Sequence, residues 1–167
     1  MAICVLFGGC MKDSVSEADA LLAEQALSGI NVRAANEESS MPSVYAKAPL
    51  IFTGNDILWY SESTKEIRFR DNTAMKDVFS KIQMLAFYLE DEYLFSAVVY
   101  FSGAKTQTIN NLVFFYNVSE NKYYLLTGYP PDVSLVDNNS RDTSMKNIAS
   151  EWKKFIDQLK KEGKHRA

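Results

Sequence analysis

Side chains able to carry chemistry are few and unevenly spread along the 167-residue chain. The two cysteines, Cys4 and Cys10, both lie in the first ten residues, so the later chain has no thiol for a disulfide, a zinc site or a nucleophile. The single histidine, His165, follows Gly163, and we expect it in a tail, where no fixed geometry would hold it beside a substrate. Glycine-rich phosphate loops and serine nucleophile elbows are also missing from the sequence.

Carboxylates are therefore the remaining catalytic candidates. The acidic residues expected in turns or loops are Asp56, Glu66, Glu90, Asp91, Glu92, Asp132 and Asp137. A glycosidase would need two of them facing each other across a cleft, about 5–9 Å apart. The alternative is that they are solvated turn residues, since charged side chains mostly lie at the surface. Glu90–Glu92 lacks the alternating ligand spacing of a calcium loop, and we expect neither a metal nor a cofactor.

Aromatic residues make up 13% of the chain and offer a second kind of site. Tyrosine and tryptophan combine apolar area with a polar tip, as binding surfaces require. Trp59, Tyr60 and Tyr129, which fall within or close to expected strands, are the candidates for an aromatic binding face. The alternative is that these rings fill the core of a sheet, because aromatic side chains are favoured in strands.

The composition indicates a folded domain without a strong electrostatic field. The hydrophobic fraction is 47% and the charged fraction is 23%, which is typical of globular proteins. A net charge of −3 gives no basic surface for nucleic acid, so we expect no partner of that class.

From Pro49 onward, the pattern predicts hairpins followed by a helix. The expected strands are Ile57–Tyr60, Glu66–Arg70, Met84–Leu89, Tyr93–Phe101, Leu112–Val118 and Tyr123–Thr127. After a long loop over 128–141, a helix should begin at Asp142 or Thr143 and end before Gly163, because apolar residues recur there at three- and four-residue steps. A shorter helix is expected within 71–82. The fold class is α+β: a mostly antiparallel sheet of five to seven strands, with the C-terminal amphipathic helix packed on one face.

The remaining chain is divided as follows. Residues 31–48 show no periodicity, so a loop is expected and the compact domain should cover 45–162, with 163–167 as a tail. Residues 10–44 should form a tether that contains a short helix over 16–28.

The start of the chain resembles the signal segment of bacterial lipoproteins. An apolar run over 2–9 ends in Leu6-Phe7-Gly8-Gly9, directly before Cys10, with Phe7 where that family usually has leucine. The resemblance implies cleavage after residue 9, lipidation of Cys10 and a membrane anchor. Lys12-Asp13 and Asp13-Ser14-Val15 resemble, respectively, the surface-export signal and the O-glycosylation motif of Bacteroidales-type lipoproteins. The alternatives are a buried N-terminal strand for 2–9 and a plain solvated tether after it.

The body of the chain also resembles uncharacterised lipoproteins of that bacterial group, through "PLIFTGNDILWYSESTKEIRFRDN" and "YLLTGYPP". The resemblance implies no known activity. We expect a lipid-anchored protein of the bacterial cell envelope, with the outer-membrane surface as one location, acting as a non-enzymatic binding or interaction module for an envelope protein or a glycan. The alternatives are a carboxylate-dependent glycan hydrolase and a structural accessory subunit of an envelope complex.

Overall fold

The computed structural model describes residues 29–35, 48–103, 107–131 and 138–167. Across these ranges, nine strands form one sheet in the order β2-β1-β5-β6-β7-β8-β4-β3-β9. The strands are Ile30–Ala35 (β1), Leu50–Thr53 (β2), Ile57–Ser61 (β3), Glu66–Phe69 (β4), Met84–Leu89 (β5), Glu92–Phe101 (β6), Val113–Asn117 (β7), Lys122–Leu126 (β8) and His165–Arg166 (β9).

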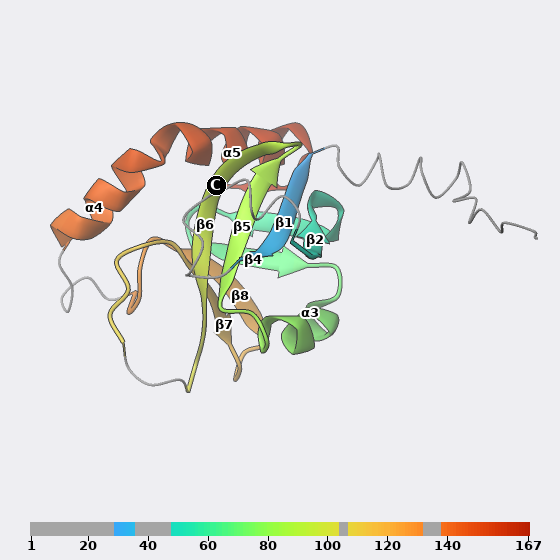
Figure 1. The fold of residues 1–167 in the computed structure, drawn as a ribbon. Coiled ribbons are helices and arrows are strands. Elements are labelled where there is room, and N and C mark those ends of the chain that lie inside the picture. Colours follow the sequence, from blue (N-terminus) through green and yellow to red (C-terminus); the bar gives the residue numbers. More distant parts are fainter. Residues whose placement is uncertain (1–28, 36–47, 104–106, 132–137) are drawn as a thin grey trace, which may run out of the picture.

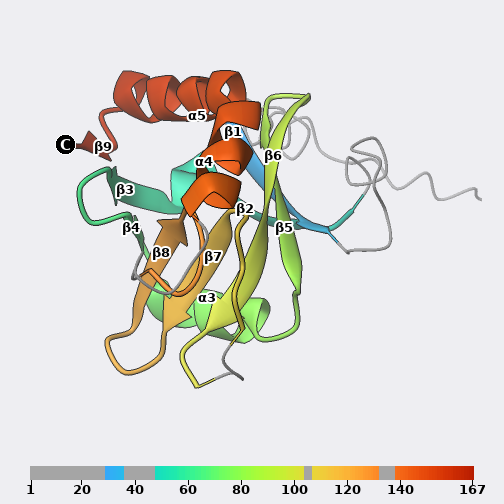
Figure 2. The ribbon, with the colours of Figure 1, turned by 90° about the vertical axis from the view of Figure 1, so that its left-hand side faces the viewer.

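Three α-helices accompany the sheet in the described part of the chain: α3 (Asn72–Phe79), α4 (Asn138–Asn147) and α5 (Ala149–Lys161). A short 3-10 turn, η1 (Gly54–Asp56), joins β2 to β3. Figures 1 and 2 show the sheet as strongly curled, with α5 lying across one end of the curl and α3 at the opposite end. The helix α4 precedes α5 and extends away from it on the side of β6 and β7.

The strand pairing confirms an α+β fold with a mostly antiparallel sheet. The three expected hairpins are present as β3–β4, β5–β6 and β7–β8. The strand count is nine rather than five to seven, and two pairs, β6–β7 and β3–β9, are parallel. The parallel pairs make the sheet mixed. Parallel neighbours such as β6 and β7 need a longer connection than the tight turn of a hairpin.

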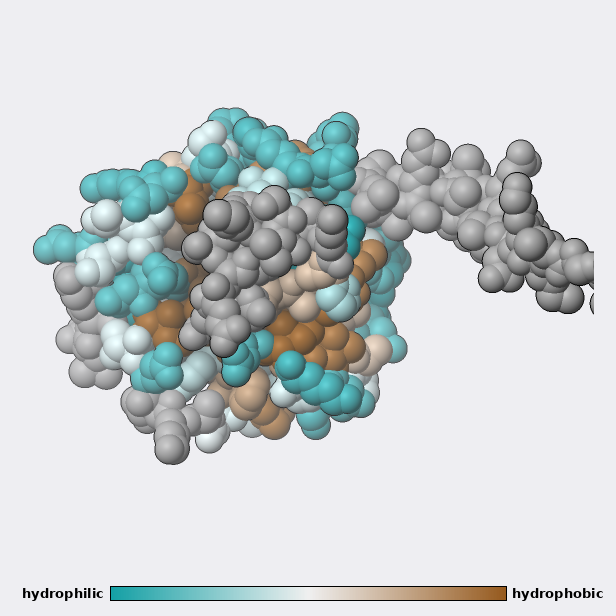
Figure 3. All heavy atoms as spheres, in the orientation of Figure 1, coloured by the Kyte–Doolittle hydropathy of each residue, from teal (hydrophilic) through white to brown (hydrophobic). Residues whose placement is uncertain are grey.

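The core lies inside the curl. Phe155, Ile156 and Leu159 of α5 are buried against it, which confirms that the amphipathic C-terminal helix packs on one face of the sheet. At the other end, the ring of Phe79 in α3 lies 4.7 Å from that of Phe114 in β7, measured between centroids. Figure 3 shows the result from outside: hydrophilic residues cover the helices along the top, and apolar residues gather over the strands below.

Two segments differ from what the pattern predicted. The structure places β1 inside the sheet, between β2 and β5, where a loop was expected over 31–48, so the sheet begins upstream of the expected boundary at residue 45. Ile30 and Val32 alternate into the core, but six residues give a weak period-2 signal. At the other end, His165–Arg166 form β9 beside β3 instead of a free tail.

The C-terminal helical region also differs in detail. Two helices replace the single one that was expected, and α4 begins at Asn138, within the stretch expected to be a loop. The backbone of Ile148 departs from helical geometry between them and caps α5. Among the described residues, no helix combines the length and apolar composition needed to cross a bilayer. Cys10 and the helix expected over 16–28 lie outside the described residues.

Candidate functional site

A concavity of the described structure lies between α4 and the β6–β7 region of the sheet. It consists of two hollows, of about 290 Å³ and about 460 Å³, which share Asn111 and Ser144. We call the two together the α4 groove. The first hollow is lined by Met84, Tyr93, Leu94, Phe95, Ser96, Val98, Asn111, Leu112, Ser144, Met145 and Ile148. The second is lined by Asn110, Asn111, Asn139, Ser140, Thr143 and Ser144.

The helix α4 supplies one wall because its polar residues recur at helical spacing. Asn139, Ser140, Thr143 and Ser144 are separated by one, three and one positions, which places them on one face of a helix. The opposite wall is the segment leading into β7. It is joined to β6 by the backbone bond from Val98 N–H to the Leu112 carbonyl, 2.9 Å long.

A side-chain hydrogen bond links the two walls. Ser144 Oγ donates to Asn111 Oδ1 at 3.0 Å, at the point where the two hollows meet. Within α4, Thr143 Oγ1 donates to the Asn139 carbonyl at 2.7 Å, which fixes the threonine side chain against its own helix. The polar wall is therefore oriented before any ligand arrives, which lowers the ordering cost of binding.

The lining of the α4 groove is polar but uncharged. Among the described residues that line either hollow, none is acidic or basic. Asparagine amides both donate and accept hydrogen bonds, and serine and threonine hydroxyls do the same. This set suits a ligand rich in hydroxyl or amide groups and offers nothing to neutralise a ligand charge.

One buried acceptor beside the α4 groove has no donor among the described residues. Asn110 lines the second hollow, and its Oδ1 is shielded from solvent without a hydrogen-bond partner in the described part of the chain. A buried polar atom left unpaired costs about 1–3 kcal/mol, and such atoms are uncommon in folded proteins. A donor in the second hollow would reach this oxygen only after the Asn110 amide turned toward the hollow.

The first hollow adds an apolar surface to the polar residues of the second hollow. Leu112, Met145 and Ile148 contribute aliphatic and thioether groups, and Tyr93 is also among the lining residues. The Tyr93 ring is held edge-to-face against Tyr88, with centroids 5.6 Å apart. An apolar surface with a few convergent polar groups is the usual composition of a small-molecule site.

The three aromatic residues named from the sequence do not line the α4 groove. Tyr60 has an exposed fraction of 0% and packs in the core, edge-on to Trp152 and Phe155 with centroids 6.2 Å away in both cases. Burial, followed by the nearby Glu62 carboxylate, raises the pKa of the Tyr60 phenol well above its ordinary value. Consequently, Tyr60 cannot share a binding surface with the other two.

Trp59 and Tyr129 lie apart from each other outside the main core. Trp59 pairs with Arg68 across the β3–β4 hairpin and has Arg166 above its ring. The Tyr129 ring packs on Tyr100, with centroids 4.5 Å apart. The structure therefore does not gather the proposed aromatic face into one site, and this part of the prediction stays without direct support.

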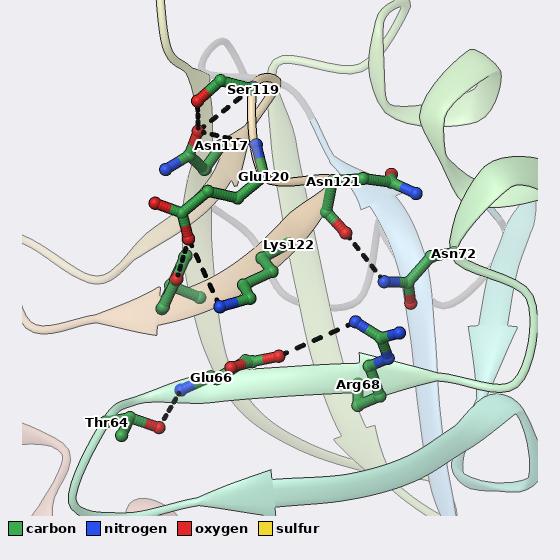
Figure 4. Close-up of polar contacts among 10 residues, drawn as sticks. Thr64, Glu66, Arg68, Asn72, Asn117, Ser119, Glu120, Asn121 and Lys122 are labelled. Carbon is green, nitrogen blue, oxygen red and sulfur yellow. Dashed lines mark hydrogen bonds and ion pairs between the residues drawn. The ribbon is translucent and has the colours of Figure 1, made fainter.

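Three of the carboxylates named from the sequence, Asp56, Glu66 and Glu92, have local partners in the described structure. Asp56 accepts the Thr53 N–H at 2.7 Å and completes the capping of η1. Figure 4 shows Glu66 directed at Arg68, 3.9 Å away, and Glu120, in the β7–β8 turn, directed at Lys122, 3.4 Å away. Asp132 and Asp137 lie outside the described residues.

The β5–β6 turn contributes one further carboxylate contact, in which Lys154 of α5 binds Glu92. This ion pair and its hydrogen bond raise the pKa of the Lys154 ammonium. Glu92 therefore faces a helix at the surface, and none of the three turn acids is among the described residues that line the α4 groove. In the described part of the chain, no three histidine, cysteine, aspartate or glutamate side chains cluster as metal ligands would.

Sequence reasoning overlooked the residues of the α4 groove. "NN" at 110–111 and "NNS" at 138–140 form a local enrichment of amides that could have drawn attention. Comparison with known proteins adds no further information, because no family model, no curated protein and no solved structure matches the chain.

Proposed function

We propose that this protein is a non-catalytic binding module that takes an uncharged, hydroxyl-rich ligand, such as a neutral glycan, into the α4 groove. The observation that carries the proposal is the buried, unpaired Asn110 Oδ1 beside a groove whose described lining is uncharged. If the Asn110 amide turns toward the second hollow, a ligand hydroxyl that donates to this oxygen removes an existing penalty instead of exchanging one hydrogen bond for another.

The composition of the α4 groove supports the same ligand class. Sugar rings present hydroxyls at their edges and C–H groups on their faces, so they need both amide partners and apolar contact. The second hollow supplies the amides, and the first supplies Tyr93 and Leu112. Volumes of about 290 Å³ and 460 Å³ are close to the range of known ligand sites, about 300–1,000 Å³.

The test is calorimetric titration of the full chain with neutral oligosaccharides: maltose-, cellulose-, xylan-, mannan- and chitin-derived series. We expect one series to bind saturably and Asn110→Ala to weaken that binding at least fivefold. Asn110→Ala should leave the unfolding midpoint unchanged or raise it, because it removes an unpaired buried acceptor. A stability loss would instead indicate a structural role.

The matched control is Asn147→Ala, which removes an exposed amide at the end of α4, outside the α4 groove. We expect this variant to bind as the unmodified protein does. Failure of all five series to bind, or equal weakening by both variants, would contradict the proposal.

We further propose that the module is held at the bacterial cell envelope by lipidation of Cys10. The support for this is the sequence Leu6-Phe7-Gly8-Gly9-Cys10 and its resemblance to a lipoprotein signal. A triacylated cysteine anchors stably, since each buried methylene contributes about 0.8 kcal/mol. An envelope location would also expose the α4 groove to glycans.

The test of the anchor is incorporation of labelled palmitate in a bacterial host. We expect label in the unmodified protein, none in Cys10→Ala, and full label in Cys4→Ala as the matched cysteine control. Label that persists in Cys10→Ala, or no label in the unmodified protein, would remove the anchor from the proposal.

A further inference from the structure

A buried arginine lies on another part of α4 from the groove. Arg141 has an exposed fraction of only 6%, and its Nη2 donates to the Pro130 carbonyl at 2.7 Å. Its Nε is buried without a hydrogen-bond partner. A guanidinium carries five N–H donors and keeps its charge at any physiological pH, and the acceptor that it reaches among the described residues, the Pro130 carbonyl, is neutral.

The surrounding backbone leaves room for this charged group. A Cβ atom on Gly128 would lie 2.2 Å from Arg141 Nε and 2.6 Å from its Cζ. It would also lie 2.8 Å from the Ile109 carbonyl oxygen, which accepts the Tyr129 N–H. Only glycine fits at 128 while the arginine keeps its position. The guanidinium is therefore a packed part of the fold and not an exposed surface side chain.

Arg141 also lines a pocket of about 230 Å³, which we call the Arg141 pocket. The described lining residues are Lys65, Leu126, Thr127, Gly128, Pro131, Asn138, Arg141 and Asp142. Lys65 comes from the β3–β4 turn and is positioned by its carbonyl, which accepts the Leu125 N–H of β8 at 2.9 Å. Two cationic side chains from distant parts of the sequence therefore meet at one cavity.

The charge balance of the Arg141 pocket favours a monoanion. Lys65 and Arg141 are positive and Asp142 is negative, so the described lining has a formal excess of one positive charge. Among the described residues, no carboxylate forms an ion pair with Arg141 within 4.0 Å. The planar fork of a guanidinium matches a carboxylate in two parallel hydrogen bonds.

We propose that the Arg141 pocket binds the carboxylate of a small organic monoanion, with Arg141 and Lys65 as its cationic partners. This site is chemically distinct from the neutral α4 groove. Binding at the Arg141 pocket therefore does not depend on the function proposed for the α4 groove.

The test follows the Arg141 Nε–H signal of the full chain in nitrogen–proton NMR spectra, during titration with glucuronate, lactate or inorganic phosphate at constant ionic strength. We expect this signal to shift saturably with a carboxylate, and phosphate to bind at least threefold more weakly. Lys65→Gln should weaken carboxylate binding at least threefold, and Arg141→Gln should abolish saturation. Arg141→Gln alters a buried position. If this variant fails to fold, the result for Lys65→Gln decides the test.

Arg68→Gln is the matched control, since Arg68 lies in the neighbouring strand β4 and pairs with Glu66 outside the Arg141 pocket. We expect this variant to bind as the unmodified protein does. Saturation that survives Arg141→Gln, no saturation with any probe, or tighter binding of phosphate would overturn the proposal. So would a shift of the ligand-free Arg141 signal in Asp132→Asn or Asp137→Asn, which would identify an internal counter-ion.

Discussion

The guanidinium of Arg166 lies over the indole ring of Trp59, with its Cζ 4.1 Å from the ring centroid. This contact links β9 to the neighbouring strand β3, and two backbone hydrogen bonds of 2.8 Å connect the same two segments. Tyr60 N–H donates to the Lys164 carbonyl, and Glu62 N–H donates to the Arg166 carbonyl. A strand of two residues has little pairing energy of its own, so the cation–π contact is a substantial part of what holds it.

Replacing Arg166 by alanine should loosen β9 without unfolding the domain. A cation–π contact at an exposed site is worth about 0.5–1 kcal/mol, which corresponds to roughly two- to fivefold faster exchange of the Glu62 amide hydrogen. Hydrogen exchange measured by NMR checks this. Arg68→Ala removes an exposed ion pair of small expected value and serves as the control. Equal exchange rates in the two variants would show that the ring contact contributes nothing.

Gly128→Ala should destabilise the protein even though alanine is a small residue. The added Cβ would meet the Arg141 guanidinium at 2.2 Å, and overpacking of this kind costs about 1–3 kcal/mol. Urea unfolding measures the loss. Adding Arg141→Ala should recover the part that the guanidinium causes, while the contact with the Ile109 carbonyl, 2.8 Å from the added Cβ, remains. Gly103→Ala is the control, since Gly103 has a φ of +97° and nothing within 4 Å of the added atom. We expect it to show the backbone cost alone, about 1 kcal/mol, with no rescue by Arg141→Ala.

The hairpins of the sheet were predictable because their signals are local. Alternation of apolar and polar residues together with polar turns specifies β3–β4, β5–β6 and β7–β8, and the periodic apolar stripe specifies α5. The strands β1 and β9 were not predictable in this way. Contacts with distant residues give these short segments their structure: Ile30 and Val32 pack in the core, and His165–Arg166 pair with β3 and contact Trp59.

The candidate site depends on contacts that sequence patterns do not report. The helix α4 is polar on nearly all sides, so its first turn, 138–141, gave no helical signal and was expected to be part of a loop. Asn111 and Ser144 are 33 residues apart, and only the parallel β6–β7 pairing and the path of α4 bring them into hydrogen-bond contact. Lys65 and Arg141 are also far apart in the sequence, and only the fold brings them to the lining of one pocket.

Two buried tyrosines should respond in opposite ways to loss of the hydroxyl. Tyr123 Oη donates to the Asn72 carbonyl at 2.9 Å, whereas Tyr60 Oη is buried with no hydrogen-bond partner. Tyr123→Phe should therefore lower the free energy of unfolding by about 0.5–1.5 kcal/mol, because it removes a buried hydrogen bond. Tyr60→Phe should leave it unchanged or raise it. Urea unfolding of both variants is the measurement, and an equal loss in both would contradict the assignment of these two hydroxyls.

The same two phenols should make the fold sensitive to alkaline pH. Burial raises the pKa of both Tyr60 and Tyr123 above the ordinary value near 10, so the folded protein retains these protons at a pH where the unfolded chain has begun to lose them. The unfolded state then binds fewer protons than the folded state, and the free energy of unfolding falls as pH rises above about 10. Below that pH, neither phenol makes the free energy of unfolding depend on pH.

Each buried phenol adds up to about 1.4 kcal/mol of stability loss per pH unit in this range. Tyr123→Phe and Tyr60→Phe should each reduce the slope of unfolding free energy against pH by about that amount, and the double variant should reduce it by the sum. Urea unfolding at several values between pH 9 and pH 11.5 gives the slope. Because the measurement compares slopes, it is independent of the stability change that each variant causes at neutral pH. A slope that neither substitution alters would mean that the alkaline loss arises elsewhere in the chain.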